Sequence, residues 1–168
     1  MIIEKIGDIF TTDTDLICHQ VNCKGVMGAG VAKTVREKIG TNEFAVYQTV
    51  CKKAGANMLG EVLYSHILYP KTLTKPQYIA NCFAQDGYGY SGQYTDYDAL
   101  GKCLQKVHDV ALQRNLSIAI PGLIGCGLAG GDWSYVKENI IAPIFQESGV
   151  ELVIYYFTQE LFEENAGF

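Results

Sequence analysis

Two glycine-rich segments carry the residues best suited to chemistry, and the first spans residues 19–35. Its sequence, HQVNCKGVMGAGVAKTV, follows the apolar run Leu16-Ile17-Cys18 and continues into apolar positions at helical spacing. Glycines at positions 25, 28 and 30 let the backbone approach a ligand closely, and the unpaired N–H groups that begin a helix attract anions. The segment predicts a site for a phosphate-bearing ligand; an ordinary strand-to-helix turn is the alternative that glycine spacing leaves open.

The second glycine-rich segment, residues 122–131, reads GLIGCGLAGG and is followed at once by Asp132. Its Gly125-x-Gly127-x-x-Gly130 pattern matches the dinucleotide-binding fingerprint, which also needs an acid about 20 residues later, at the end of the next strand. The next predicted strand here is the last one, and it ends in Tyr155-Tyr156-Phe157. We interpret the segment as a second phosphate-binding turn that faces the first.

Two other patterns suggest nucleophilic chemistry and are less specific. Cys126, with His19 as its base, would suit a thiolate phosphatase, but such an enzyme needs an arginine a few residues downstream, where this chain has GLAGGDW. A packing role is therefore expected for the thiol. The pair Asp13 and Asp15 precedes a predicted strand, whereas a phosphoaspartate motif follows one, so both are interpreted as solvated loop acids.

Metal and cofactor chemistry is not predicted. The six cysteines, at positions 18, 23, 51, 82, 103 and 126, form no CxxC pair and show none of the spacings of a structural zinc site. We expect reduced thiols that lie mostly in the core. His66 falls in an alternating strand and His108 on a predicted helix, neither at metal-ligand spacing to a partner. The sequence predicts no metal and no cofactor.

Length and composition indicate one domain over residues 1–168. A formal net charge of −5 and only two arginines, Arg36 and Arg114, argue against a nucleic-acid groove. No apolar stretch approaches the roughly 18 residues that span a membrane, and the start, MIIEKIGD, has acids where a signal peptide would be basic. We expect a cytoplasmic monomer, without a membrane partner, that holds phosphate by backbone amides.

The elements that must position the two segments alternate between strands and helices. Strands are predicted at residues 1–6, 16–21, 61–68, 77–84, 117–121 and 150–157. Helices are predicted from the first glycine loop to residue 39, over 44–54, after Asp96, after Asp132, and in the acidic tail after Thr158. This alternation indicates an α/β fold with a mixed sheet. Residues 87–94, rich in glycine and tyrosine, are expected to form a mobile rim over the ligand or a plain solvent loop.

Taken together, HQVNCKGVMGAGVA, IPGLIGCGLAGGDW and the N-terminal Gly7-Asp8-Ile9 resemble the macrodomain family, which binds ADP-ribose. The resemblance covers residues 6–157. Within the family the chain is similar to the branch of ADP-ribose-1″-phosphate phosphatases and terminal ADP-ribose glycohydrolases, through His-Gln-x-Asn-Cys, Met-Gly-Ala-Gly, Ile-Ala-Asn-x-Phe-x-Gln and Gly-Gly-Asp-Trp. The resemblance implies a three-layer α/β/α macrodomain with a mixed central sheet and the ligand at the C-terminal edge of that sheet.

Residue by residue, the resemblance implies a complete ligand site. Asp8, beside the Ile9 amide, would accept from the adenine amino group, and Phe157, with Tyr155 and Tyr156 as rivals, would pack on adenine. The implied ribose and diphosphate contacts are Asn22, Lys24, Gly25, Val26, Met27, Gly28, Ala29, Gly30 and Val31 in the first segment and Ile124, Gly125, Cys126, Gly127 and Leu128 in the second.

The resemblance also implies hydrolysis of ADP-ribose-1″-phosphate, with Asp132 and His19 as the catalytic pair. Asp132 would orient or deprotonate water or attack the phosphoryl group itself, and His19 would protonate the leaving ribose oxygen. A helix cap for Asp132 and a packing role for His19 are the structural alternatives. Removal of ADP-ribose from modified macromolecules, or ADP-ribose reading without turnover, are the alternative functions.

One departure from the family affects the glycohydrolase alternative. Glycohydrolase members use a lysine nucleophile at the end of the strand that here reads YIANCFAQ, and Gln85 occupies or neighbours that place. An amide cannot form a Schiff base. Lys71 and Lys75 precede the strand and are poor substitutes. Lysine-dependent release of ADP-ribose is therefore not expected.

Overall fold

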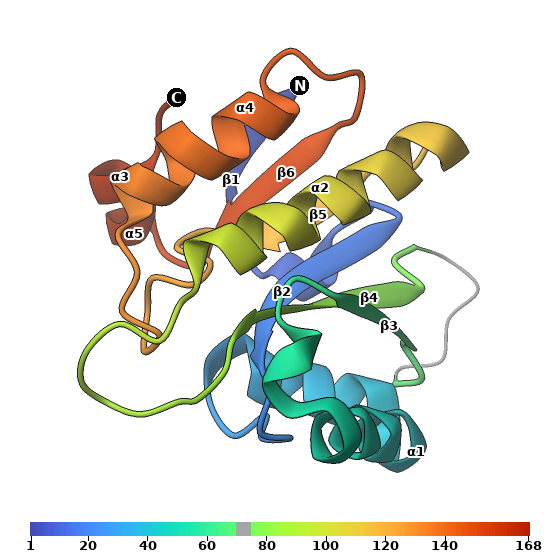
Figure 1. The fold of residues 1–168 in the computed structure, drawn as a ribbon. Helices are drawn as coiled ribbons and strands as arrows, with labels where there is room; N and C mark the ends of the chain where they lie inside the picture. The colour runs from blue at the N-terminus through green and yellow to red at the C-terminus, as the bar shows by residue number, and fades with distance from the viewer. Residues whose placement is uncertain (70–74) are drawn as a thin grey trace.

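The computed structural model describes residues 1–69 and 75–168, and a single six-stranded sheet organises them (Figure 1). The strand order is β1 (Ile2–Ile6), β6 (Leu152–Tyr156), β5 (Ile118–Pro121), β2 (Leu16–Asn22), β4 (Tyr78–Gln85) and β3 (Val62–His66). Neighbouring strands run parallel except β3, which pairs antiparallel with β4. Helices cover both faces, so the predicted three-layer α/β/α architecture with a mixed sheet is confirmed.

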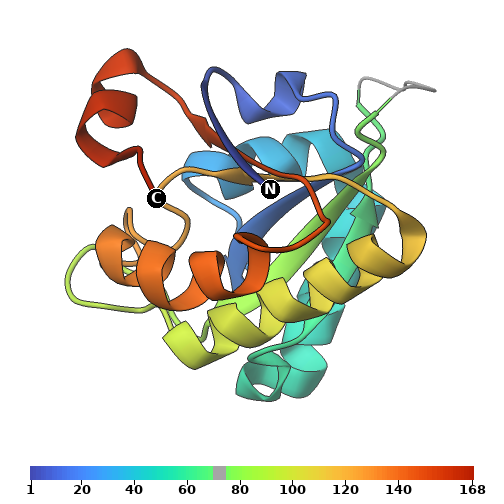
Figure 2. The ribbon, with the colours of Figure 1, turned by 90° about the horizontal axis from the view of Figure 1, so that it is seen from above.

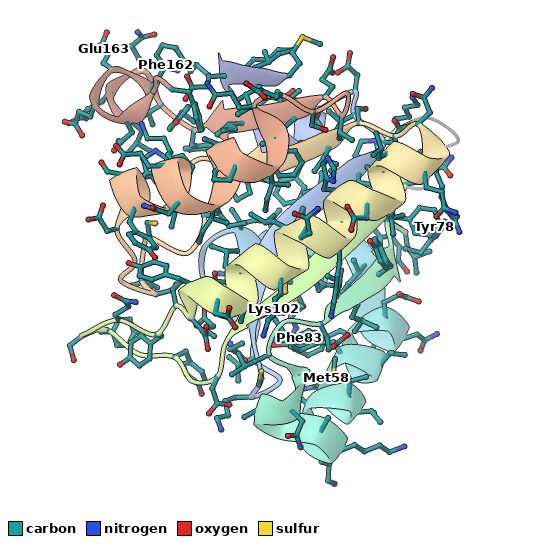
Figure 3. The ribbon with its side chains drawn as sticks, turned by 45° about the horizontal axis from the view of Figure 1, so that its top comes forward. Met58, Tyr78, Phe83, Lys102, Phe162 and Glu163 are labelled. Carbon is teal, nitrogen blue, oxygen red and sulfur yellow. The ribbon has the colours of Figure 1, made fainter. Side chains whose placement is uncertain are left out.

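One face of the sheet is covered by α2 (Tyr97–Arg114) and by a continuous segment of α3 (Trp133–Val136), a π-helical turn η3 (Lys137–Ile141) and α4 (Ala142–Phe145). These helices lie side by side in Figure 2. The apolar spacing of α2 produces this packing, because Leu100, Leu104, Val107 and Ala111 all point into the core. The short C-terminal helix α5 (Gln159–Asn165) adds Phe162, whose ring meets Tyr156 edge-on at 5.7 Å between centroids (Figure 3).

The other face is covered by α1 (Gly30–Ala54) and the short 3₁₀ turns η1 (Ile9–Thr11) and η2 (Gly55–Met58). Gly40 divides α1 into two helical halves, since its backbone has φ 79° and ψ 178°. This agrees with the two separate helical patterns of the sequence. Figure 3 labels Phe83 and Met58, which belong to the apolar cluster on this face.

The predicted strands and helices are confirmed, with strand ends that shift by one or two residues, and one loop interpretation is wrong. Asp15 is not a solvated acid: its carboxylate accepts from the Ser117 amide at 2.8 Å and pairs with Lys75 Nζ at 2.6 Å. Burial alone would raise the pKa of Asp15, but these hydrogen bonds hold it below the usual value. Pro70 and Lys71, which precede the strand predicted at 77–84, lie outside the described residues.

The cysteines lie where the sequence predicted, with five of the six buried and all six free. Within the described ranges, no group of three or more His, Cys, Asp or Glu side chains is arranged to hold a metal ion. In the same part of the chain, no helix is long and apolar enough to cross a membrane.

Candidate functional site

A cavity of about 380 Å³ opens at the C-terminal edge of the sheet, between the loops that follow β2 and β5. The chain leaves β2 toward α1 on one face and leaves β5 toward α3 on the other, so the cavity lies where neighbouring parallel strands connect in opposite directions. Open α/β sheets bind ligands at such a switch point. The described residues that line it are 19–22, 26, 28–32, 85, 88–90, 121–125 and 127–129.

The first glycine loop is held in shape by Asn22. Its Oδ1 accepts from the backbone N–H groups of Lys24 at 3.0 Å and Val26 at 3.4 Å, while its Nδ2 donates to the Val26 carbonyl at 2.7 Å. The buried Tyr47 hydroxyl from α1 also donates to this Oδ1, at 3.0 Å. These bonds fold the loop tightly around Gly25, whose φ is 79°, and one amide hydrogen of Asn22 is left over.

The start of α1 faces the cavity without a side-chain cap. Its N-cap residue is Ala29, which offers no hydrogen-bond acceptor, whereas α2, α3 and α5 are capped by Asp96, Asp132 and Thr158. Residues 30–32, which form the first turn of α1, line the cavity. Their N–H groups and the positive end of the helix dipole are therefore available to an anion.

The second glycine loop is fixed from beneath by polar side chains of the sheet. Thr95 Oγ1 donates to the Gly125 carbonyl at 2.6 Å and accepts from Gln20 Nε2 at 2.8 Å. A Cβ added at Gly125, where φ is 72°, would lie 2.8 Å from Gln20 Oε1. Leu123 also has a positive φ, 65°, which is uncommon for a residue with a side chain. Packing and backbone conformation thus both require glycine at position 125.

His19 lies on the cavity wall, 1% exposed, and its tautomer follows from its neighbours. Asn81 Nδ2 donates to the Leu63 carbonyl and to Ser65 Oγ, both at 2.8 Å, so Asn81 Oδ1 must face His19. His19 Nε2, 2.7 Å from that oxygen, therefore carries the hydrogen and Nδ1 holds a lone pair. Nδ1 is buried and has no hydrogen-bond partner in the described part of the protein.

Burial lowers the pKa of His19 to about 4, and the hydrogen bond to Asn81 opposes this shift only in part. The imidazole is therefore neutral at pH 7, and its unpartnered ring nitrogen, which is itself buried, is an acceptor and not an acid. Among the described lining residues there is no aspartate, glutamate, lysine or arginine. An anionic ligand would therefore meet backbone N–H groups, while His19 Nδ1 and Gln20 Oε1 are acceptors buried in the cavity wall without a partner.

The glycine and tyrosine loop after β4 forms one rim of the cavity, as predicted, through Tyr88, Gly89 and Tyr90. Figure 1 shows that this loop extends away from the sheet beside the loop that follows β5. Its far end is anchored there, because the Tyr94 and Thr95 N–H groups both donate to the Ala129 carbonyl, at 2.7 and 3.2 Å. Tyr90 is 92% exposed. Mobility of this rim stays a prediction.

Most of the predicted ribose and diphosphate contacts line the cavity; they are Asn22, Val26, Gly28, Ala29, Gly30, Val31, Ile124, Gly125, Gly127 and Leu128. Four of the predicted contacts lie outside the described lining and support the loops instead. Lys24 pairs with Asp86 at 3.3 Å, Met27 is 1% exposed in the core, and Gly25 forms the turn. Cys126 is partly buried behind the second loop, where burial and the charge of Asp132 raise its pKa to about 12, which favours the packing role.

The predicted adenine contacts form a neighbouring group at the same edge of the sheet. Asp8 follows β1, and its Oδ1 caps η1 by accepting from the Phe10 amide at 2.9 Å. The register of β1 and β6 pairs Ile6 with Tyr156, which sets Asp8 close to Phe157. Tyr156 is buried, whereas Phe157 is 73% exposed, so Phe157 is the better candidate for stacking. Asp8, Ile9 and Phe157 are not among the described cavity-lining residues.

Asp132 also lies outside the described lining of the cavity. Its Oδ1 accepts from the Ser134 and Tyr135 amides at 3.0 and 3.4 Å, which is the capping arrangement that the sequence left as an alternative. Sequence reasoning missed Gln20 and Thr95, which hold the second glycine loop through the Gly125 carbonyl. The position of Gln20 next to His19 was the one available signal for Gln20. Nothing local indicates Thr95, because the two residues that form this hydrogen bond are 75 positions apart in the sequence.

Comparison with known proteins agrees with this geometry. The chain is 28% identical over 158 residues to a DNA ADP-ribosyl glycohydrolase of Mycobacterium tuberculosis and 26% identical over 152 residues to one of Thermus aquaticus. The alignments cover 92% and 89% of this chain but 42% and 39% of those proteins. The chain thus spans about two fifths of the length of the curated relatives it matches.

Solved structures show the same fold. The macrodomain of Mycobacterium tuberculosis DarG superposes with a TM-score of 0.75 at 28% identity, over 92% of this chain and 97% of that one. A protein of unknown function from Bacteroides thetaiotaomicron gives a TM-score of 0.76 at 25% identity, over 94% and 98%. The Macro domain family model itself matches residues 18–140. Because that match covers most of the chain and both glycine loops, the protein belongs to the Macro domain family.

Proposed function

We propose that the protein binds ADP-ribose in this cavity and releases it by hydrolysis from ADP-ribosylated macromolecules. The observation that carries the proposal is an anion site built without charged side chains: the uncapped start of α1 faces the second glycine loop across the cavity. The names of the curated relatives, DNA ADP-ribosyl glycohydrolases, support removal from a macromolecule over hydrolysis of a free 1″-phosphate.

In the proposed pose the diphosphate lies over the first turn of α1 and the loop at Gly125. The adenine extends toward the edge of β1 and β6, where Asp8 can accept from its amino group and Phe157 can stack on it. The distal ribose then meets the opposite end of the cavity, at His19, Gln20 and the tyrosine rim. Nδ1 of His19 and Oε1 of Gln20 are buried acceptors without partners, and ribose hydroxyls, which are donors, would pair with them once the side chains of the wall shift.

The chemistry we propose is direct attack by water. The water oxygen forms a bond to ribose C1″ as the bond from C1″ to the macromolecule breaks, and the proton of the water passes to the leaving group or to solvent. His19 Nδ1 accepts a hydrogen bond from this water or from the adjacent hydroxyl and so holds it in place. Gln85 cannot replace a lysine nucleophile; its Nε2 donates to the Gly87 carbonyl and its Oε1 accepts from Gln20, so it braces the rim.

The hydrolysis of ADP-ribose-1″-phosphate that the sequence suggested has less support. That mechanism needs His19 to donate a proton, but its imidazole is neutral at pH 7. It also needs Asp132 to act on water or on the phosphoryl group, but Asp132 caps α3 outside the described lining of the cavity. A catalytic Asp132 and an acidic His19 therefore stay predictions of the sequence alone.

A paired assay tests the proposal. Calorimetry should detect ADP-ribose binding, and incubation with ADP-ribosylated DNA, ADP-ribosylated protein and ADP-ribose-1″-phosphate should release ADP-ribose from a macromolecule. His19→Ala should lower turnover about 10²-fold, the scale of a lost catalytic group, with ADP-ribose affinity within a few fold of the parent. Asp132→Asn, which keeps a capping oxygen, is the matched control and should retain parent turnover. Binding without release from any substrate would leave a reader module, and absence of binding would refute the proposal.

A further inference from the structure

A second hollow, about 500 Å³ in volume, runs along α1 and shares Gly28 with the ligand cavity. We call it the α1 groove and define it by Gly28, Lys33, Arg36, Glu37, Phe44 and Tyr69. It lies at the break in α1, where a Cβ on Gly40 would come within 2.9 Å of the Tyr69 ring. The groove therefore continues outward from the loop that holds the proposed ligand.

Two cations of the α1 groove have no acidic partner in the described part of the chain. Lys33 and Arg36 are exposed and form no ion pair there. Four lysines elsewhere on the surface lie 2.6–3.3 Å from carboxylates, namely Lys24, Lys75, Lys102 and Lys106. Because Glu37 also lines the groove, its two cations leave one positive charge in excess in a protein that is acidic as a whole.

Aromatic rings accompany these cations. The Arg36 guanidinium lies over the Phe44 ring, 4.1 Å from its centroid, which fixes the group flat and leaves its N–H edges for an acceptor. Tyr69 presents a ring that is 61% exposed, and its backbone N–H is tied to the Lys38 carbonyl at 2.9 Å. Cations beside an exposed aromatic ring, here Tyr69, are the combination that binds phosphodiesters and stacks bases in single-strand sites.

We propose that the α1 groove binds the nucleic-acid strand that carries the ADP-ribose group, with Lys33 and Arg36 on its phosphates and Tyr69 stacked on a base. This proposal rests on the proposed function, and it specifies that the ADP-ribosylated substrate is single-stranded nucleic acid, DNA or RNA. It also revises the expectation, drawn from net charge, that the protein has no nucleic-acid groove. The strand leaves the ligand cavity across Gly28 and follows α1.

The test uses a fluorescent single strand of about 12 nucleotides, within the usual site size of such grooves, and anisotropy over a salt series. Arg36→Gln and Lys33→Gln should each weaken binding about fivefold at roughly 0.1 M salt and reduce the salt slope by about 0.7, the value for one single-strand phosphate contact. Lys53→Gln, in the last turn of α1 outside the groove, is the matched control and should change little. Tyr69→Ala should weaken binding without changing the salt slope.

A gain of affinity separates the proposal from damage to the fold. Glu37 lines the α1 groove and repels phosphate, so Glu37→Gln should tighten strand binding, which an unfolding variant cannot do. On ADP-ribosylated strands the Arg36→Gln variant should raise KM and leave kcat unchanged. DNA and RNA arms of the same length show which backbone is preferred, and binding of either supports the groove.

Several outcomes would overturn the groove. Equal loss of affinity in Lys53→Gln would mean that only net charge matters, and no binding of either strand, or unchanged binding in all groove variants, would exclude the site. Release of ADP-ribose from ADP-ribosylated protein but not from strands would assign the groove to another partner. Calorimetry with free ADP-ribose separates these results from failure of the proposed function, because all groove variants should bind it like the parent.

Discussion

The protonation of His19 gives the sharpest test of the cavity. Its pKa is 6.5 in an unfolded chain and about 4 in the folded protein, where burial opposes the charged ring. Between these values the unfolded chain binds a proton that the folded protein does not, so the unfolding free energy must fall as the pH falls. This contribution is fully present above pH 6.5 and is lost progressively until about pH 4.

The size of the effect follows from the two pKa values. Lowering the pH from about 7 to about 5 should remove roughly 2 kcal/mol of unfolding free energy through this one group. For a domain of this length that corresponds to a fall in melting temperature of about 4–8 °C. Most carboxylates stay ionised over that interval, so the imidazole contribution is well separated from theirs.

Urea unfolding at both pH values measures the effect, with the linear slope checked for constancy. His19→Gln should remove this part of the pH dependence, whereas His66→Gln, at an exposed position on β3, should retain it. NMR of the imidazole nitrogens should show hydrogen on Nε2 and a titration near pH 4. Titration near pH 6.5, or hydrogen on Nδ1, would refute both the tautomer argument and the acceptor role of His19 in the proposed hydrolysis.

Two further predictions concern the frame around the cavity. Gly125→Ala should lower the melting temperature by about 2–8 °C, since a side chain at positive φ costs about 1–2 kcal/mol. Gly127→Ala is the control, because a Cβ there meets open space, and it should leave the melting temperature unchanged. Equal melting curves for the two variants would contradict the packing argument. Asp15→Asn should reduce the loss of unfolding free energy in acid. Burial alone would raise the pKa of Asp15, but hydrogen bonds from Lys75 and Ser117 hold that pKa below 3.8. The stabilising contribution of Asp15 is therefore present above pH 3.8 and is lost as the pH falls through the lower pKa of the folded protein. Acid unfolding of the two proteins measures this, and parallel curves would show that Asp15 is not stabilising.

Much of this molecule could be predicted from local sequence. Glycines between an apolar run and a helical pattern marked both loops, and Asp96 was found as a cap because capping depends on residues three positions apart. Strand and helix order followed from periodicity. These features depend on neighbours in sequence, and so they can be read without the fold.

The features that sequence reasoning missed depend on partners far along the chain. Asp15 was interpreted as solvated because nothing local indicates that Ser117 lies beside it, 102 positions away. For Asp132 the sequence offered both a catalytic role and a helix cap, and only the fold shows that its carboxylate accepts from the amides of its own helix. Net charge likewise does not indicate that Lys33 and Arg36 share one hollow, because it sums charges that the fold keeps apart.

The missing cap of α1 has a consequence for the stability of the unliganded protein. A serine, threonine or aspartate at position 29 would satisfy the first-turn amides and add about 0.5–2 kcal/mol of stability. Such a residue would also occupy the amides that an anion needs. At Ala29, greater stability of the unliganded protein and ligand binding therefore exclude one another. A variant selected only for heat resistance would tend to acquire a polar residue at this position and lose the ability to bind its ligand.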